Sequence, residues 1–203
     1  QLDRQLVLSS GANAARREAA LAQRGLQEIA RYANVPLTPR QRTTAAVIRW
    51  QCEQTIESEK FARHRFIFDQ FRGLHVTLVN FLTARHPTRN QRDAENYFAR
   101  LARVGPVMDE GIAETLSAAE AGFLPPRFIL ERCIEQLNKF TGAEPASNPL
   151  VATFSERLLK LGDKISEPER QRLVAAAQKE LRATFLHAYL RARSLLESQL
   201  PKA

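Results

Sequence analysis

The sequence predicts an all-α protein: an array of seven to eight helices that includes two long amphipathic helices, at about residues 39–65 and 166–199. Glycine is rare, with 8 residues in 203, while Ala, Leu, Arg, Glu and Gln, which lose little entropy in a helix, are abundant. Apolar residues recur every three to four positions, and no segment keeps the two-residue alternation of a strand. We expect a single helical domain over residues 1–203, with the linker 141–149 as its one possible point of division.

The first predicted helix covers residues 13–33 and ends at the turn-forming segment 34–39. Thr38 followed by Pro39 is typical of a helix N-cap with proline in the first turn, so the first long helix begins there. Its apolar stripe comprises Ala45, Ile48, Cys52 and Ile56.

The middle of the chain begins with an apolar, aromatic stretch at residues 66–71, which could be an extended buried connector or a continuation of the helix before it. A short helix follows Gly73. From Asp93 the pattern is helical again, and Gly105-Pro106 predicts a kink or a restart of that helix. Gly122 is a natural C-cap.

The last third is predicted to hold three more helices. The first runs from Arg127 to Phe140, and the second spans about 150–161 and ends at Gly162. Ser166 and Glu169 have the spacing of a capping box, which predicts the start of the second long helix.

The net charge of +8 is unevenly distributed, because all of the basic excess lies in residues 1–103. Such an excess can serve nucleic-acid binding. The arginines are scattered among acidic residues, however, and this favours a solvated surface over a nucleic-acid partner. No apolar run approaches the length of a transmembrane helix, so we expect no transmembrane segment.

The sequence shows no recognisable catalytic or metal-binding motif. No two of the four histidines stand three to five residues apart, and the two cysteines, Cys52 and Cys133, are too far apart in sequence for a metal pair. Phosphate-binding loops and nucleophile elbows are also missing. We therefore expect no catalytic residue, no metal site and no cofactor in this chain.

From Asp93 onward the chain resembles the bacterial domain-of-unknown-function 885 family (DUF885). The resemblance starts at Asp93–Leu101, with the sequence DAENYFARL, and continues through the segment 106–112. It then covers the turn GFLPPRFIL at 122–130 and the segment IEQL at 134–137. The ordered series extends over roughly residues 15–199.

The resemblance implies that this chain is the non-catalytic helical N-terminal region of a zinc-dependent hydrolase similar to the α-helical metallopeptidases. Many family members carry a zinc motif like H-E-x-x-x-G-H in the C-terminal half, and no residue here matches it. Zinc is thus expected in the full-length family members and not in this chain. Whether the chain belongs to an enzyme stays open, because the chain itself has no catalytic motif. The implied partners are a missing C-terminal half or a partner chain and a peptide-like substrate, and the implied location is periplasmic or exported.

Within that frame Arg100 and Arg127 are the candidate binding residues. An arginine can bind a carboxylate through two hydrogen bonds, either at a peptide terminus or on an aspartate of a cleft. The alternative is a salt bridge or cap between helices. Two other functions also remain open for the whole chain: a stand-alone helical interaction module, suggested by the two long amphipathic helices, and, less favoured, a basic nucleic-acid-binding domain.

Overall fold

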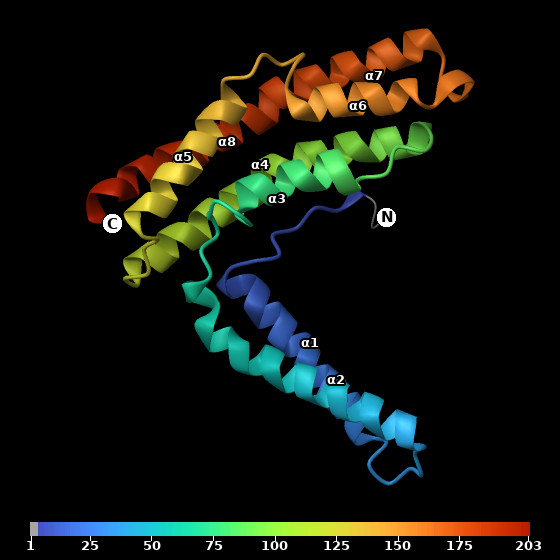
Figure 1. Cartoon of the computed structure of the whole chain (residues 1–203), viewed down its shortest axis with the longest axis vertical. Helices are drawn as coiled ribbons and strands as arrows, with labels where there is room; N and C mark the ends of the chain where they lie inside the picture. The colour runs from blue at the N-terminus through green and yellow to red at the C-terminus, as the bar shows by residue number, and fades with distance from the viewer. Residues whose placement is uncertain (1–3) are drawn as a thin grey trace. The chain divides into compact units, whose positions relative to one another are not determined.

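The computed structural model describes residues 4–203 and shows an all-α protein with no β-strand in that range, which confirms the predicted fold class (Figure 1). The chain forms two compact units: residues 9–65 make the smaller, and the segment up to Leu8 together with residues 66–203 makes the larger. The linker 141–149 lies inside the larger unit. The assignment of one domain to residues 1–203 stays a prediction.

The smaller unit is a hairpin of two helices, α1 (Ala12–Ala30) and α2 (Pro39–Ser58), and α2 runs on into the 3-10 turn Glu59–His64. Thr38 caps α2 as predicted. Its hydroxyl oxygen accepts a hydrogen bond from the backbone N–H of Gln41 at 3.3 Å, and the Gln41 side chain accepts one from the Thr38 backbone N–H at 2.9 Å. This reciprocal pair explains why the helix starts at Pro39.

The contact between the two helices of the hairpin is made by small side chains. Three alanines of α1 are buried, and an added Cβ on Gly25 would lie 3.1 Å from the Cys52 sulfur, so the helices approach closely there. By contrast, α2 has no fully buried residue. Ile48, which we expected on its inward stripe, is 41% exposed. A large part of the apolar surface of α2 is therefore left uncovered within the hairpin.

The larger unit is a bundle in which α4 and α8 lie at the centre. α8 packs against α5 and α4, and α6 packs against α7. Figure 1 shows these neighbouring pairs. The helices of this unit are α3 (Leu74–Asn80), α4 (Gln91–Glu120), α5 (Arg127–Thr141), α6 (Pro149–Leu159), α7 (Glu167–Glu180) and α8 (Leu186–Gln199).

Two π turns interrupt regular helix in this unit. The turn Phe81–Arg85 follows α3, and the turn Leu181–Phe185 joins α7 to α8 into one continuous run. That run corresponds to the second predicted long helix. The second π turn packs against α4, and an added Cβ on Gly105 of α4 would lie 3.0 Å from a Thr184 methyl. The glycine thus permits the close approach of the two elements.

One local prediction was wrong, and one of the two alternatives for Gly105-Pro106 is excluded. The helix does not restart at Gly105-Pro106, because α4 continues through Pro106. The capping box at Ser166 does not form: the Ser166 side chain makes no capping hydrogen bond, and the Glu169 carboxylate accepts from Arg172, at 2.6 and 2.8 Å. Gly122, in contrast, has a φ of 85° directly after the end of α4, as a C-cap requires.

The connector at residues 66–71 is a turn and not a helix, and it is only partly buried, since Phe71 is 78% exposed. Ile67 and Phe68 are buried, while one Asp69 carboxylate oxygen accepts hydrogen bonds from the backbone N–H groups of Phe71 and Arg72, both at 2.8 Å. Gly73 closes this turn, and an added Cβ there would lie 2.4 Å from the Asp69 carbonyl oxygen. Only glycine fits, so the entry of the chain into α3 is fixed.

Candidate functional site

The most concentrated polar arrangement in the interior of the larger unit is centred on His86 and Arg100. His86 follows the π turn Phe81–Arg85 directly and is 2% exposed, while Arg100 lies in α4 and is 8% exposed. A buried guanidinium is costly unless its donors are satisfied. Its partners therefore indicate what this site can do.

The pairing with Arg100 determines the protonation of His86. Nη1 of Arg100 lies 2.7 Å from Nδ1 of His86, and because a guanidinium can only donate, Nδ1 must accept and carries no proton. Nε2 then donates to the backbone carbonyl of Asp93 at 2.9 Å. Burial lowers the pKa of His86, and the nearby charges of Arg100 and Arg157 lower it further. The imidazole is held neutral with both ring nitrogens engaged.

Arg100 also ties three separate segments together. Its Nε donates to the Gln5 carbonyl at 3.3 Å, and its Cζ lies 5.0 Å from the centre of the Phe81 ring, a cation–π arrangement. Through these contacts the N-terminal segment, the π turn and α4 are held against one another. The partners of Arg100 include a histidine, a backbone carbonyl and an aromatic ring. Its binding of a substrate carboxylate stays a prediction.

Arg157 supports the same site from α6. Its guanidinium donates to the backbone carbonyls of His86, at 2.8 Å, and of Thr83. A π turn leaves carbonyl groups without their regular helical partners, and a buried carbonyl needs a donor. The Arg157 side chain supplies it, which links α6 to the irregular end of the α3 segment.

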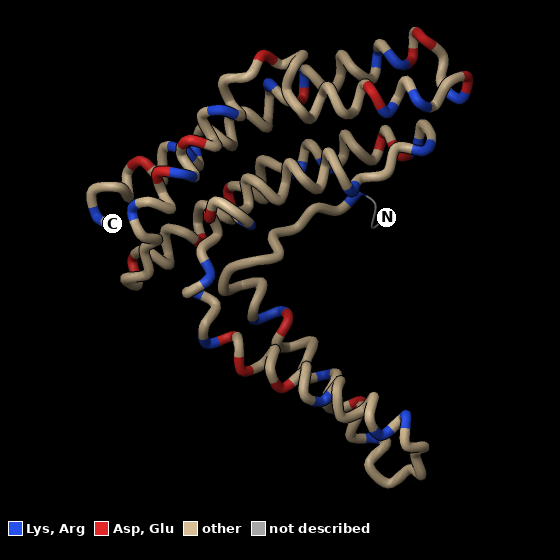
Figure 2. The backbone as a smooth tube through the Cα atoms, in the orientation of Figure 1, with Lys and Arg blue, Asp and Glu red and all other residues tan. Residues whose placement is uncertain are grey.

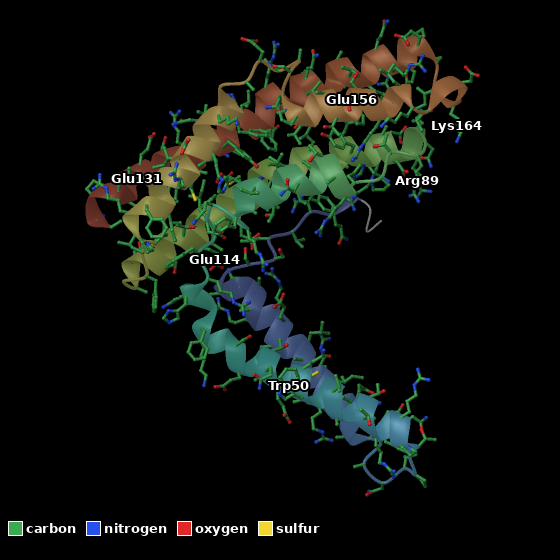
Figure 3. The ribbon with its side chains drawn as sticks, viewed as in Figure 1. Trp50, Arg89, Glu114, Glu131, Glu156 and Lys164 are labelled. Atoms are coloured by element: carbon green, nitrogen blue, oxygen red, sulfur yellow. The ribbon has the colours of Figure 1, made fainter. Side chains whose placement is uncertain are left out.

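The start of α4 completes the arrangement. Asn90 caps the helix by accepting from the Asp93 N–H at 2.9 Å. The Asp93 carboxylate accepts from the Arg89 backbone N–H at 3.0 Å and from its Nε at 2.9 Å, and these hydrogen bonds lower the pKa of Asp93. Figure 3 shows Arg89 at the turn that leads into α4. The carboxylate thereby holds the turn that carries His86 close to the helix.

Arg127, the other predicted site residue, is placed quite differently. It lies on the surface of α5, where its Nε donates to Glu131 of the same helix at 2.9 Å, with both side chains more than half exposed. Glu131 is labelled in Figure 3. The structure thus does not join Arg100 and Arg127 in one site: the first is part of an interior network and the second forms a local surface pair. A ligand role for Arg127 stays a prediction.

A second buried polar group, which sequence reasoning missed, lies around His75. Its Nε2 is 2.8 Å from Oε1 of Gln136, its backbone carbonyl accepts from the Tyr189 hydroxyl at 2.7 Å, and its Nδ1 is buried without a hydrogen-bond partner. Burial lowers the pKa of His75. Burial also raises the pKa of nearby Cys133 to about 12, helped by the negative charge of Asp69. The partners come from distant helices, so no sequence spacing could have signalled the group.

Metal ligands, grooves and membrane-spanning helices are the other features of residues 4–203 that bear on function. Within residues 4–203, no three His, Cys, Asp or Glu side chains are grouped so that they could hold a metal ion. A groove of about 300 Å³ lies between α6 and α7, but its Arg170 is already bonded to Glu167 and to two backbone carbonyls. In the same range, no helix is both long enough and apolar enough to cross a bilayer.

The comparisons with known proteins place this fold in a larger context. The model of the family "Bacterial protein of unknown function (DUF885)" matches residues 3–203. No curated protein matches the chain. A solved structure, described as a "putative lipoprotein" from Colwellia psychrerythraea, is similar over the whole of this chain, with a TM-score of 0.82 and 18% sequence identity. This chain spans 36% of the length of that protein. At such low identity the likeness shows the fold alone.

Proposed function

The chain belongs to the bacterial family of unknown function DUF885, and from this premise we propose that it is the non-catalytic, helical N-terminal region of a longer zinc-dependent hydrolase that acts on peptide-like substrates. The observation that carries the proposal is the fold comparison: all of this chain is similar to about a third of a longer protein. What the family resemblance implies, a metallopeptidase-like protein with its zinc motif in the C-terminal half, supports the class of reaction.

The His86–Arg100 network supports a scaffold role for this region. Both nitrogens of the imidazole are engaged, which leaves it no position for a proton transfer to a substrate. The guanidinium groups of Arg100 and Arg157 serve backbone carbonyls and so fix the path of the chain. We propose that this region shapes one wall of a substrate cleft and that the reacting groups belong to the rest of the protein.

Among the described residues, no group of side chains fits a zinc ion. Structural and catalytic zinc sites use at least three protein ligands from His, Cys, Asp and Glu, and no such trio is grouped within the described range of 4–203. His75 and His86 are both buried, each with Nε2 in a hydrogen bond. No catalytic step is therefore assigned to this chain.

We further propose that the protein is exported. The related structure is described as a "putative lipoprotein", a class of exported, membrane-anchored proteins, and the resemblance to the family suggests the same location. Fractionation of cells that express the complete gene product tests this proposal. The account expects the protein in the periplasmic or membrane fraction, and finding it only in the cytosol would contradict it.

The proposed reaction is tested by comparing the complete product of the gene with the 203-residue chain. The complete product should retain stoichiometric zinc and hydrolyse unblocked peptides, and a chelator should abolish that activity. The chain alone should do neither. Hydrolysis by the chain alone, or a complete product that neither binds zinc nor cleaves peptides, would overturn the proposal.

A further inference from the structure

The hairpin of α1 and α2 exposes apolar side chains in its connecting loop and along α2. Tyr32 and Val35 in the loop are 57% and 47% exposed, and Trp50 on α2 is 60% exposed. Beside them lies a hollow of about 460 Å³, and Ala46 is one of the residues that line it. Ala46 and Trp50 are four residues apart and so lie on the same side of α2. We call these residues, with Arg42 and Arg49, the tip surface.

Basic residues outnumber acidic ones around the tip surface. Between Ile29 and Cys52 the chain has four arginines and no acidic residue. Figure 2 shows the basic positions continuing to the loop end of the hairpin. Of these arginines, Arg31 is paired with Glu28 at 2.9 Å. Arg42 and Arg49 both line the hollow and are exposed, and neither forms an ion pair with a carboxylate of the described residues.

The two arginines are positioned to act together. They are seven residues apart, two turns of the helix, and therefore project from one side of α2 about 10 Å apart along its axis. These two cations lie beside the apolar residues of the hollow and the exposed rings of Tyr32 and Trp50. The tip surface thus combines positive charge with hydrophobic surface.

We propose that the tip surface binds the surface of a bilayer that contains anionic phospholipid. Arg42 and Arg49 contact the phosphate groups, which attract basic side chains near the surface. Tyr32 and Trp50 sit at the headgroup level, where amphipathic rings are enriched, and Val35 reaches the start of the acyl chains. This binding is independent of the proposed hydrolase function, because it uses only residues of the hairpin.

The aliphatic residues favour a lipid surface over nucleic acid. A nucleic-acid backbone would satisfy the arginines, but it gives no apolar surroundings to Val35, Pro36 and Leu37, which line the same hollow. A bilayer interface offers both anionic groups and hydrocarbon within a few ångströms. The experiment must therefore distinguish binding to anionic lipid from binding to other polyanions.

The test uses vesicles of phosphatidylcholine alone or mixed with phosphatidylglycerol. Trp50 is the only tryptophan of the chain, so its emission reports on the tip surface directly. The 203-residue protein should co-sediment with the mixed vesicles and not with phosphatidylcholine alone. Its tryptophan emission should shift to the blue on binding, and high salt should reverse the effect.

Variants show whether the tip surface is responsible. The variant R42Q/R49Q loses two arginine contacts to the anionic surface. Its partitioning onto the mixed vesicles should therefore weaken about 30-fold. The matched control R92Q/R103Q removes the same charge from exposed positions of α4 and should leave partitioning unchanged. Tyr32→Ser with Val35→Ser should also reduce binding. All these side chains are exposed, so helix content, checked by circular dichroism, should be retained.

Several results would overturn the proposal. These are absence of binding to the mixed vesicles, equal binding to phosphatidylcholine alone, or equal losses in R42Q/R49Q and R92Q/R103Q. Duplex DNA and polyglutamate serve as the other polyanions. If either shifted the Trp50 emission as strongly as the mixed vesicles do, the surface would be a general polyanion site and the lipid assignment would fail.

Discussion

Arg100 shows how a single buried guanidinium can hold several parts of a fold together. Replacing it in Arg100→Met would leave Nδ1 of His86 and the Gln5 carbonyl without their donor. Each buried polar group that loses its partner costs about 1–3 kcal/mol, so we expect the free energy of unfolding to fall by about 3 kcal/mol. Urea unfolding followed by far-UV circular dichroism measures this loss.

Arg127→Met is the matched control for that substitution. The Arg127–Glu131 pair is more than half exposed on both sides, and exposed pairs contribute little. Its loss should change the unfolding free energy by no more than about 0.5 kcal/mol. Equal effects of the two substitutions would mean that the interior network is not a stabilising element.

The two buried histidines also make stability depend on pH. Burial lowers the pKa of both His75 and His86 in the folded protein, whereas in the unfolded chain they take up protons near the ordinary value of about 6.5. Below that pH the unfolded state binds more protons, so stability should fall as the pH decreases from 7.5 to 5. Urea unfolding at a series of pH values checks the slope. Equal stability at both ends would contradict the neutral assignment of the two rings.

Among the elements, the π turn Phe81–Arg85 depends on a side chain from another helix. Arg157→Gln would shorten the donor and leave the carbonyls of Thr83 and His86 unpaired. We expect a loss of about 1–3 kcal/mol in unfolding free energy. Amide hydrogen exchange should become faster within the turn but not in α5. Unchanged exchange in the turn would show that Arg157 does not hold it.

The connector before α3 depends on glycine at position 73. In Gly73→Ala the new Cβ would lie 2.4 Å from the carbonyl oxygen and 2.5 Å from the nitrogen of Asp69, and backbone atoms cannot move away as a flexible side chain can. We expect a loss of more than about 2 kcal/mol, in the range of severe overpacking. Gly122→Ala is the comparison: it has a φ of 85° but open space around it, and should cost only about 1 kcal/mol. Calorimetric melting of both variants tests the ranking.

Sequence reasoning worked where the determining contacts are local. The Thr38 cap was predictable because Gln41 is three residues away, and the Gly122 cap because glycine alone tolerates its φ. It failed at Ser166, whose side chain makes no capping hydrogen bond although its spacing from Glu169 is that of a capping box. The interior network could not be foreseen, since it joins His86 to partners 14 and 71 residues away and depends on a π turn without a known sequence signal.

At the scale of the whole molecule, part of the basic excess of residues 1–103 can be located in the structure. Part of it belongs to the hairpin, where the segment between Ile29 and Cys52 has arginines and no acid. The sequence alone could not separate this segment from a uniformly solvated helix. The exposure of Tyr32, Val35 and Trp50 beside the arginines distinguishes it, because burial depends on the path of the folded chain.

The proposed division between a helical scaffold here and zinc chemistry in the rest of the protein is tested most directly by a zinc titration. The purified 203-residue chain, stripped with a chelator and dialysed, would be titrated with Zn²⁺ in a calorimeter beside the complete gene product treated in the same way. The account predicts one tight site in the complete product and none in the chain. A tight, stoichiometric site in the 203 residues themselves would contradict it.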